Sequence, residues 1–491
     1  MTSEIGRRRA LQIAGFGAVA VAAGGAGTWR WVVAPATGSL QPSAGQALRE
    51  PAALTSRDGI LDVQLTAGAG VALAGRRTQA LGYNGTSPGP TLRVAPGDLL
   101  RVSLTNALEE TTNLHTHGLH VSPKDNSDNV FRMVEPGQGA TYEYVIPADH
   151  PAGTFWYHPH HHGTVADQVF GGLFGAVVVA GLGTSGEARE RVLVISDTTL
   201  TAGGEVAQVS TQQVMAGREG ELVLVNGQLR PVIGSTAGSP ERWRVINACT
   251  SRFLELQLDD HTWGFLGYDG QALGNPVPRD TVVLAPGNRA DLLLEPLGAG
   301  TFTLRTLAHD RGGMGMMMGD AGSTSTGATL ATVQVASGTA AGGPTPPWTA
   351  PARHVADLRD GTVSARRTIT FTMGMGMGMG GGGMEFGFDG RQFDPSRVDQ
   401  QVALGTIEEW TIANTSPMDH PFHLHVWPMQ VMDAPDVDHS GPPDWRDVVT
   451  VPAHGQVSVR IRFADFDGRT VYHCHVLDHE DQGMMGIIDA R

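Results

Sequence analysis

The sequence has few cysteines and few positive charges. Only two of its 491 residues are cysteines, so at most one disulfide can form. Lysine and arginine number 34 against 49 aspartates and glutamates, which gives a formal net charge of −15. This acidic balance argues against nucleic acid and anionic lipid as partners. Charged residues make up only 17% of the chain, but the apolar content of 41% is normal, so disorder is confined to local tracts.

A long apolar run is also missing. The uncharged stretch over 13–27 is too short for a membrane span and has the length of a signal-peptide apolar region. It follows Arg7-Arg8-Arg9, a twin-arginine pattern. We therefore predict a twin-arginine signal segment over 1–36, no integral membrane span, and a periplasmic, cell-envelope or extracellular location. An uncleaved anchor is the alternative.

Glycine and proline, in contrast, are frequent. The 66 glycines and 29 prolines indicate many turns between short strands. Apolar and polar residues alternate over 61–65 and again over 99–104, as in half-buried strands, and no long amphipathic helix stands out. A chain of this length exceeds one hydrophobic core, and about three domains are expected. These features predict an all-β protein of three sandwich or barrel domains.

Breaks in the strand pattern give the predicted domain organisation. A Pro-, Ser- and Ala-rich linker follows the signal segment, and a Gly/Pro/Ala-rich linker precedes the last domain. The predicted segments are a linker over 37–55, domains over 56–181 and 190–336, a linker over 337–365, and a third domain over 366–491.

Four histidine clusters contain ten of the 19 histidines. They read His115-Thr116-His117, His158-Pro159-His160, His420-Pro421-Phe422-His423-Leu424-His425 and His473-Cys474-His475, with His479 and Met484 following the last. Histidines two residues apart point the same way from an extended strand. The clusters lie in the first and third domains, so a shared site requires these domains to meet. The middle domain is then expected to act as a spacer.

Cys474 indicates copper. A cysteine thiolate, two imidazoles and a long axial thioether are the ligands of a blue-copper electron-transfer site. One loop supplies Cys474, His479 and Met484, and His420 is the candidate for the second imidazole. The other cysteine, Cys249, lies in an apolar stretch and is expected to be a buried structural thiol. A disulfide between Cys249 and Cys474 is rejected, because it would remove the thiolate.

The remaining eight clustered histidines suit three further copper ions. His473 and His475 point to the opposite face of the strand from Cys474, so they can bind other metals one residue away and leave a covalent path for electrons. Four-electron reduction of O₂ to water needs four redox centres, and four copper ions match that need.

With these motifs the sequence resembles the three-domain multicopper oxidases, which include laccases, bilirubin oxidase, ascorbate oxidase and the bacterial copper-efflux oxidases. The resemblance covers roughly residues 55–491 and implies three cupredoxin-like Greek-key β-barrel domains with one type 1, one type 2 and two type 3 copper ions. It implies that the type 1 ligands are His420, Cys474, His479 and Met484, the type 2 ligands His115 and His423, and the type 3 ligands His117, His158 and His475 on one ion and His160, His425 and His473 on the other. The second cluster continues as His161-His162, whose members are either metal-delivery residues or bystanders.

Two acidic residues are candidates for proton supply, which water formation requires. Glu480 follows His479 directly and resembles the proton-relay acid of the copper-efflux oxidases. Asp128 resembles a second family acid near the type 2 copper, with Asp125 as a rival. The alternative is that these carboxylates only orient the ligand imidazoles.

Methionines suggest the substrate. Nine of the 17 lie in two Gly-rich tracts, over 314–318 and in a Met-rich loop over 373–384. Soft thioethers favour Cu(I), so the leading hypothesis is an enzyme that oxidises Cu(I) with O₂. The alternatives are a laccase-type oxidase of phenols or aromatic amines, and a copper-sequestering protein without turnover, against which the retention of Cys474 argues. We expect a monomer.

Overall fold

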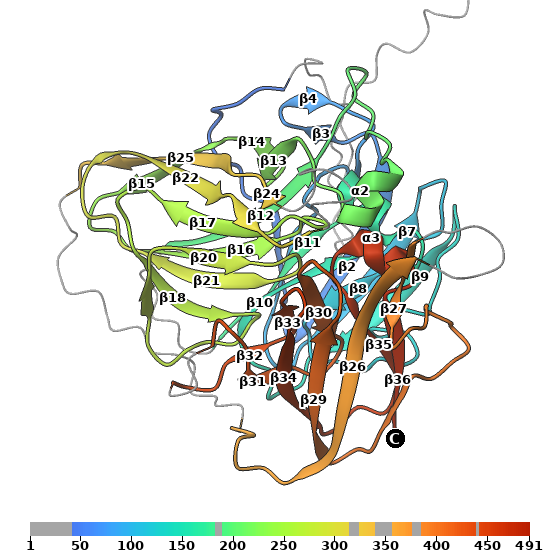
Figure 1. Ribbon diagram of the computed structural model, residues 1–491. Helices are drawn as coiled ribbons and strands as arrows, with labels where there is room; N and C mark the ends of the chain where they lie inside the picture. The colour runs from blue at the N-terminus through green and yellow to red at the C-terminus, as the bar shows by residue number, and fades with distance from the viewer. Residues whose placement is uncertain (1–41, 182–188, 314–323, 339–355, 376–383, 438–440) are drawn as a thin grey trace, which may run out of the picture. The chain divides into compact units, whose positions relative to one another are not determined.

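The computed structural model describes residues 42–181, 189–313, 324–338, 356–375, 384–437 and 441–491 (Figure 1). Within these ranges the chain forms 36 strands and three short helices, which confirms the all-β class. No helix in the described part of the chain is long and apolar enough to cross a membrane. The predicted signal segment, the tract over 314–318 and most of the Met-rich loop lie outside the described residues.

The first pair of sheets is built from residues 53–179. Its strands are β1 (Ala53–Thr55), β2 (Ile60–Ala69), β5 (Leu81–Tyr83), β6 (Thr91–Val94), β7 (Leu99–Asn106), β8 (His115–His117), β9 (Gly139–Val145), β10 (Gly153–His158) and β11 (Gly175–Val179). One sheet has the order β5-β2-β7-β9 and the other β1-β6-β11-β10-β8. Strand β2 alternates exposed and buried side chains, as its sequence predicts, and its inward residues pack against those of the second sheet. The short hairpin β3 (Ala72–Leu73) and β4 (Arg76–Arg77) stands apart.

The middle pair of sheets follows. Its strands are β12 (Arg189–Thr198), β13 (Leu222–Val225), β14 (Gln228–Leu229), β15 (Val232–Thr236), β16 (Glu241–Asn247), β17 (Leu254–Leu258), β18 (Trp263–Tyr268), β19 (Val277–Arg279), β20 (Val282–Leu284), β21 (Arg289–Leu294), β22 (Gly300–Leu307) and β25 (Ala328–Ala336). The orders are β14-β13-β12-β16-β21-β18-β19 and β15-β25-β22-β17-β20. A small ladder joins β23 (His309–Asp310) to β24 (Thr324–Ser325). Cys249 is free and buried in the core of this pair, as predicted.

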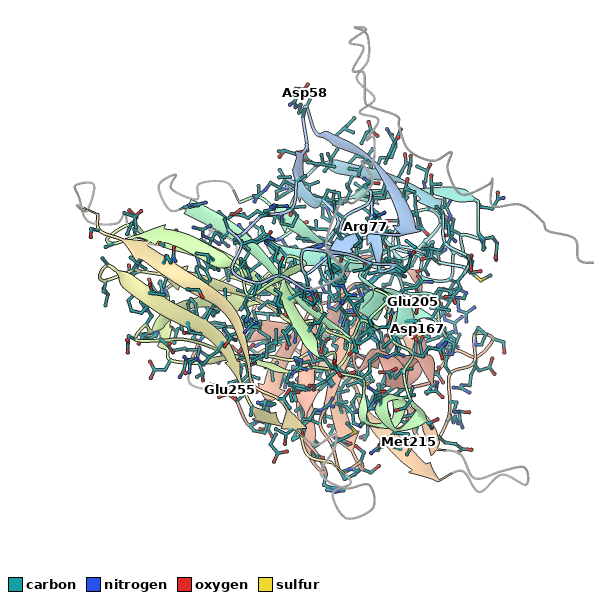
Figure 2. All side chains as sticks on the ribbon, turned by 90° about the horizontal axis from the view of Figure 1, so that it is seen from above. Asp58, Arg77, Asp167, Glu205, Met215 and Glu255 are labelled. Carbon is teal, nitrogen blue, oxygen red and sulfur yellow. The ribbon has the colours of Figure 1, made fainter. Side chains whose placement is uncertain are left out.

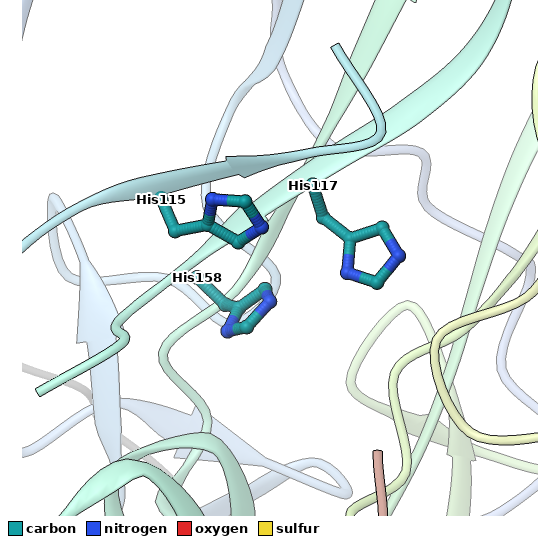
Figure 3. Close-up of side chains that lie close together, drawn as sticks. All are labelled: His115, His117 and His158. Carbon is teal, nitrogen blue, oxygen red and sulfur yellow. The ribbon is translucent and has the colours of Figure 1, made fainter. Parts of the chain in front are cut away.

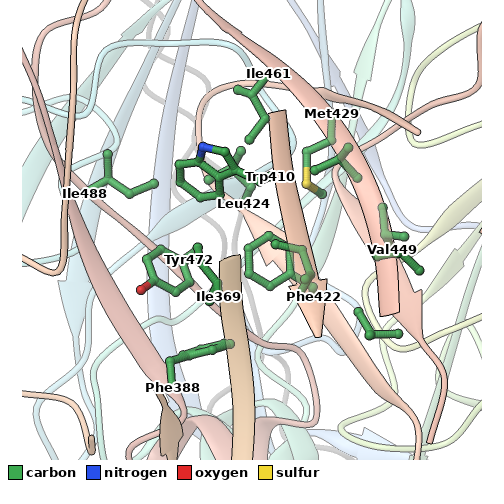
Figure 4. Close-up of a cluster of buried hydrophobic side chains, with 14 of the residues drawn as sticks. Ile369, Phe388, Trp410, Phe422, Leu424, Met429, Val449, Ile461, Tyr472 and Ile488 are labelled. Carbon is green, nitrogen blue, oxygen red and sulfur yellow. The ribbon is translucent and has the colours of Figure 1, made fainter. Parts of the chain in front are cut away.

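The third pair of sheets contains the last two histidine clusters. Its strands are β26 (Val363–Met375), β27 (Met384–Phe388), β28 (Gln400–Val402), β29 (Thr406–Asn414), β30 (His420–Leu424), β31 (Met429–Asp433), β32 (Trp445–Arg446), β33 (Val448–Val451), β34 (Gln456–Phe463), β35 (Gly468–Cys474) and β36 (Met485–Ala490). The orders are β27-β26-β29-β34-β31-β32 and β28-β36-β35-β30-β33. Figure 4 shows the core between these sheets, where Trp410, Phe422 and Tyr472 are fully buried together.

The same topology occurs three times. A parallel pair, β2/β7, β12/β16 or β26/β29, is followed in each case by an antiparallel neighbour, β9, β21 or β34. In the other sheets β6/β11, β15/β25 and β28/β36 are likewise parallel. The sheet pairs occur in the predicted order along the chain, while the predicted domain boundaries stay predictions.

The three sheet pairs meet around an apolar cluster. Trp156 of the first pair, Ile246 of the middle pair and Leu477 next to the third are all fully buried in it. Two short helices lie here, α1 (Val165–Gly171) and α3 (Leu477–Asp481), and a third, α2 (Thr211–Ala216), contacts α3. Strands β8, β10 and β30 are buried along their whole length because they are covered on both faces. All four histidine clusters therefore lie in the interior.

Candidate metal centre

Eight histidines converge where the first and third sheet pairs meet. Antiparallel pairing places His158 opposite His115, and His473 opposite His423. Figure 3 shows His115 and His117 of β8 above His158 of β10. Each of the eight side chains is at most 2% exposed: His115, His117, His158, His160, His423, His425, His473 and His475.

The ring nitrogens of these histidines gather in sets of three. Nε2 of His473 lies 3.1 Å from Nε2 of both His160 and His425. Potential ligand atoms also lie within 4.8 Å of one another in the sets His115, His117 and His158, and His115, His423 and His425. The structure thus brings together histidines that the sequence places in four separate clusters.

The hydrogen bonds of three of these histidines suit metal ligation. In each of them Nδ1–H is the donor. His115 donates to the carboxylate of Asp128 (2.9 Å), His158 to the carbonyl of Pro159 (2.8 Å) and His423 to the carbonyl of Asp447 (2.8 Å). The buried Nε2 of each has no hydrogen-bond partner among the described residues. Metal-ligating imidazoles are held in this way, with one nitrogen anchored and the other free. A set made only of imidazole nitrogens suits copper, so the residues fit the metal.

Burial keeps His158 and His160 neutral, and the neutral imidazole is the form that binds metal. Burial, reinforced by the charge of His160, lowers the pKa of His158 to about 3. For His160, burial is again the main cause of a pKa lowered to about 4.

A second candidate site is centred on Cys474. Its sulfur lies 3.4 Å from Nδ1 of His420 and 4.0 Å from Nδ1 of His479. The opposite nitrogens are anchored, since Nε2 of His420 lies 2.8 Å from Oγ of Ser416 and Nε2–H of His479 donates to the Met215 carbonyl (3.2 Å). Burial raises the pKa of the Cys474 thiol, so a thiolate here needs a cation beside it.

Met484 and two phenylalanines complete the surroundings of Cys474. Met484 is fully buried, and its carbonyl accepts a hydrogen bond from the backbone N–H of Cys474 (3.0 Å). The ring of Phe371 stacks on His420 at 4.9 Å, and that of Phe386 on His479 at 4.8 Å. The thiol therefore lies in an apolar, water-poor environment.

The two predicted acids both touch clustered histidines. Oε2 of the fully buried Glu480 lies 3.0 Å from Nδ1 of His473, and Oε1 lies 3.5 Å from Nε2 of His160. Burial alone would raise the pKa of Glu480, but these imidazoles outweigh it and lower the pKa. Burial raises the pKa of Asp128 to about 7. The rival Asp125 is exposed in a turn.

Sequence reasoning missed one acid of the site. Oδ1 of Asp447 lies 3.1 Å from Nε2 of His117, and Asp447 forms a potential ligand set with His117 and His423. Burial raises its pKa to about 7. Asp447 also lines a cavity of about 290 Å³, together with Trp427 and Trp445. Asp447 belongs to no histidine motif, so no spacing pointed to it.

His161 and His162 take part in other contacts. Nδ1 of His161 lies 3.3 Å from Oγ1 of Thr164, and the ring of His162 packs on Phe393 at 4.7 Å. Within the part of the chain that the structure describes, neither joins a set of potential metal ligands.

The comparisons with known proteins cover the three sheet pairs. Three family models, each described as multicopper oxidase, match residues 65–182, 176–336 and 350–491. The chain belongs to the multicopper oxidase family. This membership confirms the resemblance and, with the repeated topology, the cupredoxin-like fold. It also supports a copper-dependent oxidoreductase that acts with O₂.

Individual relatives are distant but extend over most of the chain. A multicopper oxidase named mco from Staphylococcus haemolyticus is 26% identical over 84% of this chain and 84% of its own length. The cell division protein FtsP of Edwardsiella tarda is 29% identical over 84% of this chain and 86% of its own. Among solved structures, a Campylobacter jejuni multicopper oxidase described as a metallo-oxidase has a TM-score of 0.79 and 29% identity, with 91% of this chain and 95% of that chain covered.

Proposed function

We propose that this oxidase takes electrons from Cu(I) at a type 1 copper and delivers them to O₂ at a cluster of three further copper ions. The observation that supports this most strongly is the position of Cys474 between two clustered histidines. Its side chain lies with His420 and His479, whereas His473 and His475 on either side lie among the other six histidines. Two metal sites are thus joined by a few covalent bonds.

The proposed ligands follow the family motifs. The type 1 ion would be held by His420, Cys474, His479 and Met484, and the type 2 ion by His115 and His423. One type 3 ion would be held by His117, His158 and His475, and the other by His160, His425 and His473. The set of His160, His425 and His473 has the strongest support, because Nε2 of His473 lies 3.1 Å from Nε2 of each of the other two.

Bound copper would supply one-electron redox chemistry at both sites. The chain's own residues do the rest. The Cys474 backbone provides the electron path to His473 and His475, and the stacked rings of Phe371 and Phe386 exclude water from the thiolate. Conversion of one O₂ into two waters takes four electrons from four Cu(I) and four protons. We assign proton delivery to Glu480, and its contacts with His473 and His160 support this role.

Methionines near the Cys474 site support Cu(I) as the electron donor. Half-buried Met215 on α2 (Figure 2) and Met373 on β26 pack against the core that contains Cys474. The backbone of Met375 pairs with that of Met384 in the β26–β27 hairpin, and Phe386 of β27 stacks on His479. Thioethers bind Cu(I) in preference to hard cations. The similar Campylobacter jejuni enzyme is described as a metallo-oxidase.

The main alternative is a laccase-type oxidase of phenols that uses the same Cys474 site. The relationship to a cell division protein allows a non-redox role for this scaffold, but the buried thiol with two aligned imidazoles favours electron transfer.

Oxygen uptake by the copper-loaded protein tests the proposal. The donors are Cu(I) and a dimethoxyphenol, and the variants lack residues 376–383 or, as a matched control, the methionine-free residues 182–188. Loss of Cu(I) turnover in the first variant alone supports a cuprous oxidase. Strong phenol turnover, with Cu(I) turnover unaffected by either deletion, would establish a laccase instead.

A further inference from the structure

One residue controls the hydrogen bonds of two histidines at the meeting point of the sheets. The Asp447 carboxylate accepts a hydrogen bond from Nε2–H of His117 (3.1 Å), while its backbone carbonyl accepts one from Nδ1–H of His423 (2.8 Å). The ring nitrogen that stays available for a metal therefore differs between the two histidines: it is Nδ1 in His117 and Nε2 in His423. Both are buried and have no hydrogen-bond partner among the described residues.

The carboxylate of Asp447 is in turn held by an arginine of the middle sheet pair. Nη1 and Nη2 of Arg289 each lie 2.6 Å from one carboxylate oxygen, a two-point contact that fixes the plane of the carboxylate. Arg289 is fully buried, and its Nε–H donates to the Thr154 carbonyl (3.1 Å) of the first pair. Arg289 thus contacts all three sheet pairs, and the middle pair is more than the spacer that the sequence suggested.

Close contacts hold the backbone around this ion pair in place. Oδ2 of Asp269, also from the middle pair, accepts the backbone N–H groups of Asp447 and Val448, both at 3.2 Å. Gly118 follows His117 with φ +84°, and a Cβ there would lie 2.4 Å from Nη2 of Arg289 and from Oδ2 of Asp447. Only glycine fits between the histidine and the ion pair.

We propose that Arg289 and Asp447 are positioning residues, which determine the nitrogen that His117 and His423 each present to copper. This inference rests on the proposed copper site. Without the guanidinium, the carboxylate could turn away and release His117 to present Nε2 instead. Loss of such an indirect partner of a metal ligand typically weakens metal binding about 10–100-fold.

A second buried ion pair serves as a control. It distinguishes an effect on the positions of the histidines from a general loss of protein stability. Arg191 and Glu241 lie in the same middle sheet, are each 3% exposed and form a 2.6 Å contact. They bind no clustered histidine in the described structure. The variants are Arg289→Met, Arg289→Lys and Asp447→Asn, with Arg191→Met as the control.

Copper retention against a chelator, copper content and the paramagnetic resonance spectrum are measured on each loaded protein. We expect Arg289→Met and Asp447→Asn to lose copper from the imidazole sites about 10–100-fold more readily, with the visible thiolate absorbance of the Cys474 site intact. Arg289→Lys should recover part of the loss, and Arg191→Met should retain copper like the wild type. Equal losses in Arg289→Met and Arg191→Met, or wild-type retention in Arg289→Met, would overturn the inference. A wild-type protein that binds no copper at the histidines would instead overturn the proposed function, and this inference with it.

Discussion

Nδ1 of His420 lies 3.4 Å from the sulfur of Cys474, although the two residues are 54 positions apart. The contact arises because β30 and β35 are antiparallel neighbours, with Phe422 directly opposite Cys474. The ladder of backbone hydrogen bonds positions the thiol, and the loop after β35 then supplies His479. The sheet therefore sets the geometry of this site before any metal binds.

The first prediction concerns the two cysteines. Cys474→Ser removes the soft thiolate, so we expect the visible charge-transfer absorbance and substrate oxidation to disappear while copper at the imidazole sites remains. Absorbance, copper content and oxygen uptake check this. Cys249→Ser is the control, because it also places a hydroxyl in a core. It should cost about 1–3 kcal/mol of stability and leave the colour unchanged. Retained colour in Cys474→Ser would refute the assignment.

Glu480→Gln tests proton delivery. Glutamine has the same shape but cannot pass on a proton, so we expect turnover with O₂ to fall about 100-fold or more with the thiolate absorbance intact. Stopped-flow reoxidation of the fully reduced protein isolates the oxygen step. If reoxidation is as fast as in the wild type, Glu480 only holds His473 and His160 in place.

Two substitutions at Asp128 separate proton supply from orientation of His115. Asparagine can still accept the Nδ1–H of His115, whereas alanine cannot. We expect Asp128→Asn to retain copper with slower oxygen reduction, and Asp128→Ala to bind copper about 10-fold more weakly. Normal turnover in Asp128→Asn would leave orientation as the only role.

Asp481 stabilises the start of α1 from a distant part of the chain. Its carboxylate accepts the backbone N–H groups of Gly163 (2.7 Å) and Ala166 (2.8 Å), and the N-cap residue Thr164 makes no side-chain capping bond. Loss of a capping acceptor costs about 1–2 kcal/mol. Denaturant unfolding of Asp481→Ala should show this decrease. Asp467→Ala, which removes an exposed ion pair with Lys124, should change stability by less than about 1 kcal/mol.

Stability should also depend on the charge of His120. Its Nδ1–H donates to the Val426 carbonyl (2.9 Å) and its Nε2–H to Asp465 (2.8 Å), so both nitrogens need protons. Burial opposes the charge, but the bond to Asp465 outweighs it and raises the pKa of His120 above the ordinary value of 6.5. This contribution is complete below pH 6.5 and is lost as the pH rises through the higher folded-state pKa. As the pH rises above 6.5, the unfolding free energy of the wild type should decrease, and that of His120→Gln should decrease less. Parallel curves for the two proteins would contradict a stabilising role for the charge of His120.

The sequence predicted the local parts of the site and missed the distant ones. Spacing alone singled out Cys474, His479 and Met484 as candidate ligands, because one strand and one loop contain them. The family resemblance favoured Asp128 over Asp125, and the folded chain adds that Asp128 is the one of the two that reaches His115. Arg289 lies 158 positions from Asp447 on a strand of ordinary apolar pattern. A contact of that kind depends on how the three sheet pairs pack together. The alternation of apolar and polar residues along the sequence does not indicate it.

The pairing of Cys474 with Phe422 and of His473 with His423 has a consequence for how the gene can change. An insertion of one codon within β35 would turn the thiol toward the histidine cluster and the histidines toward the apolar core, and would thereby disrupt both candidate metal sites at once. Length changes should therefore be tolerated in loops far better than within β30 and β35, where the register must be kept to the residue.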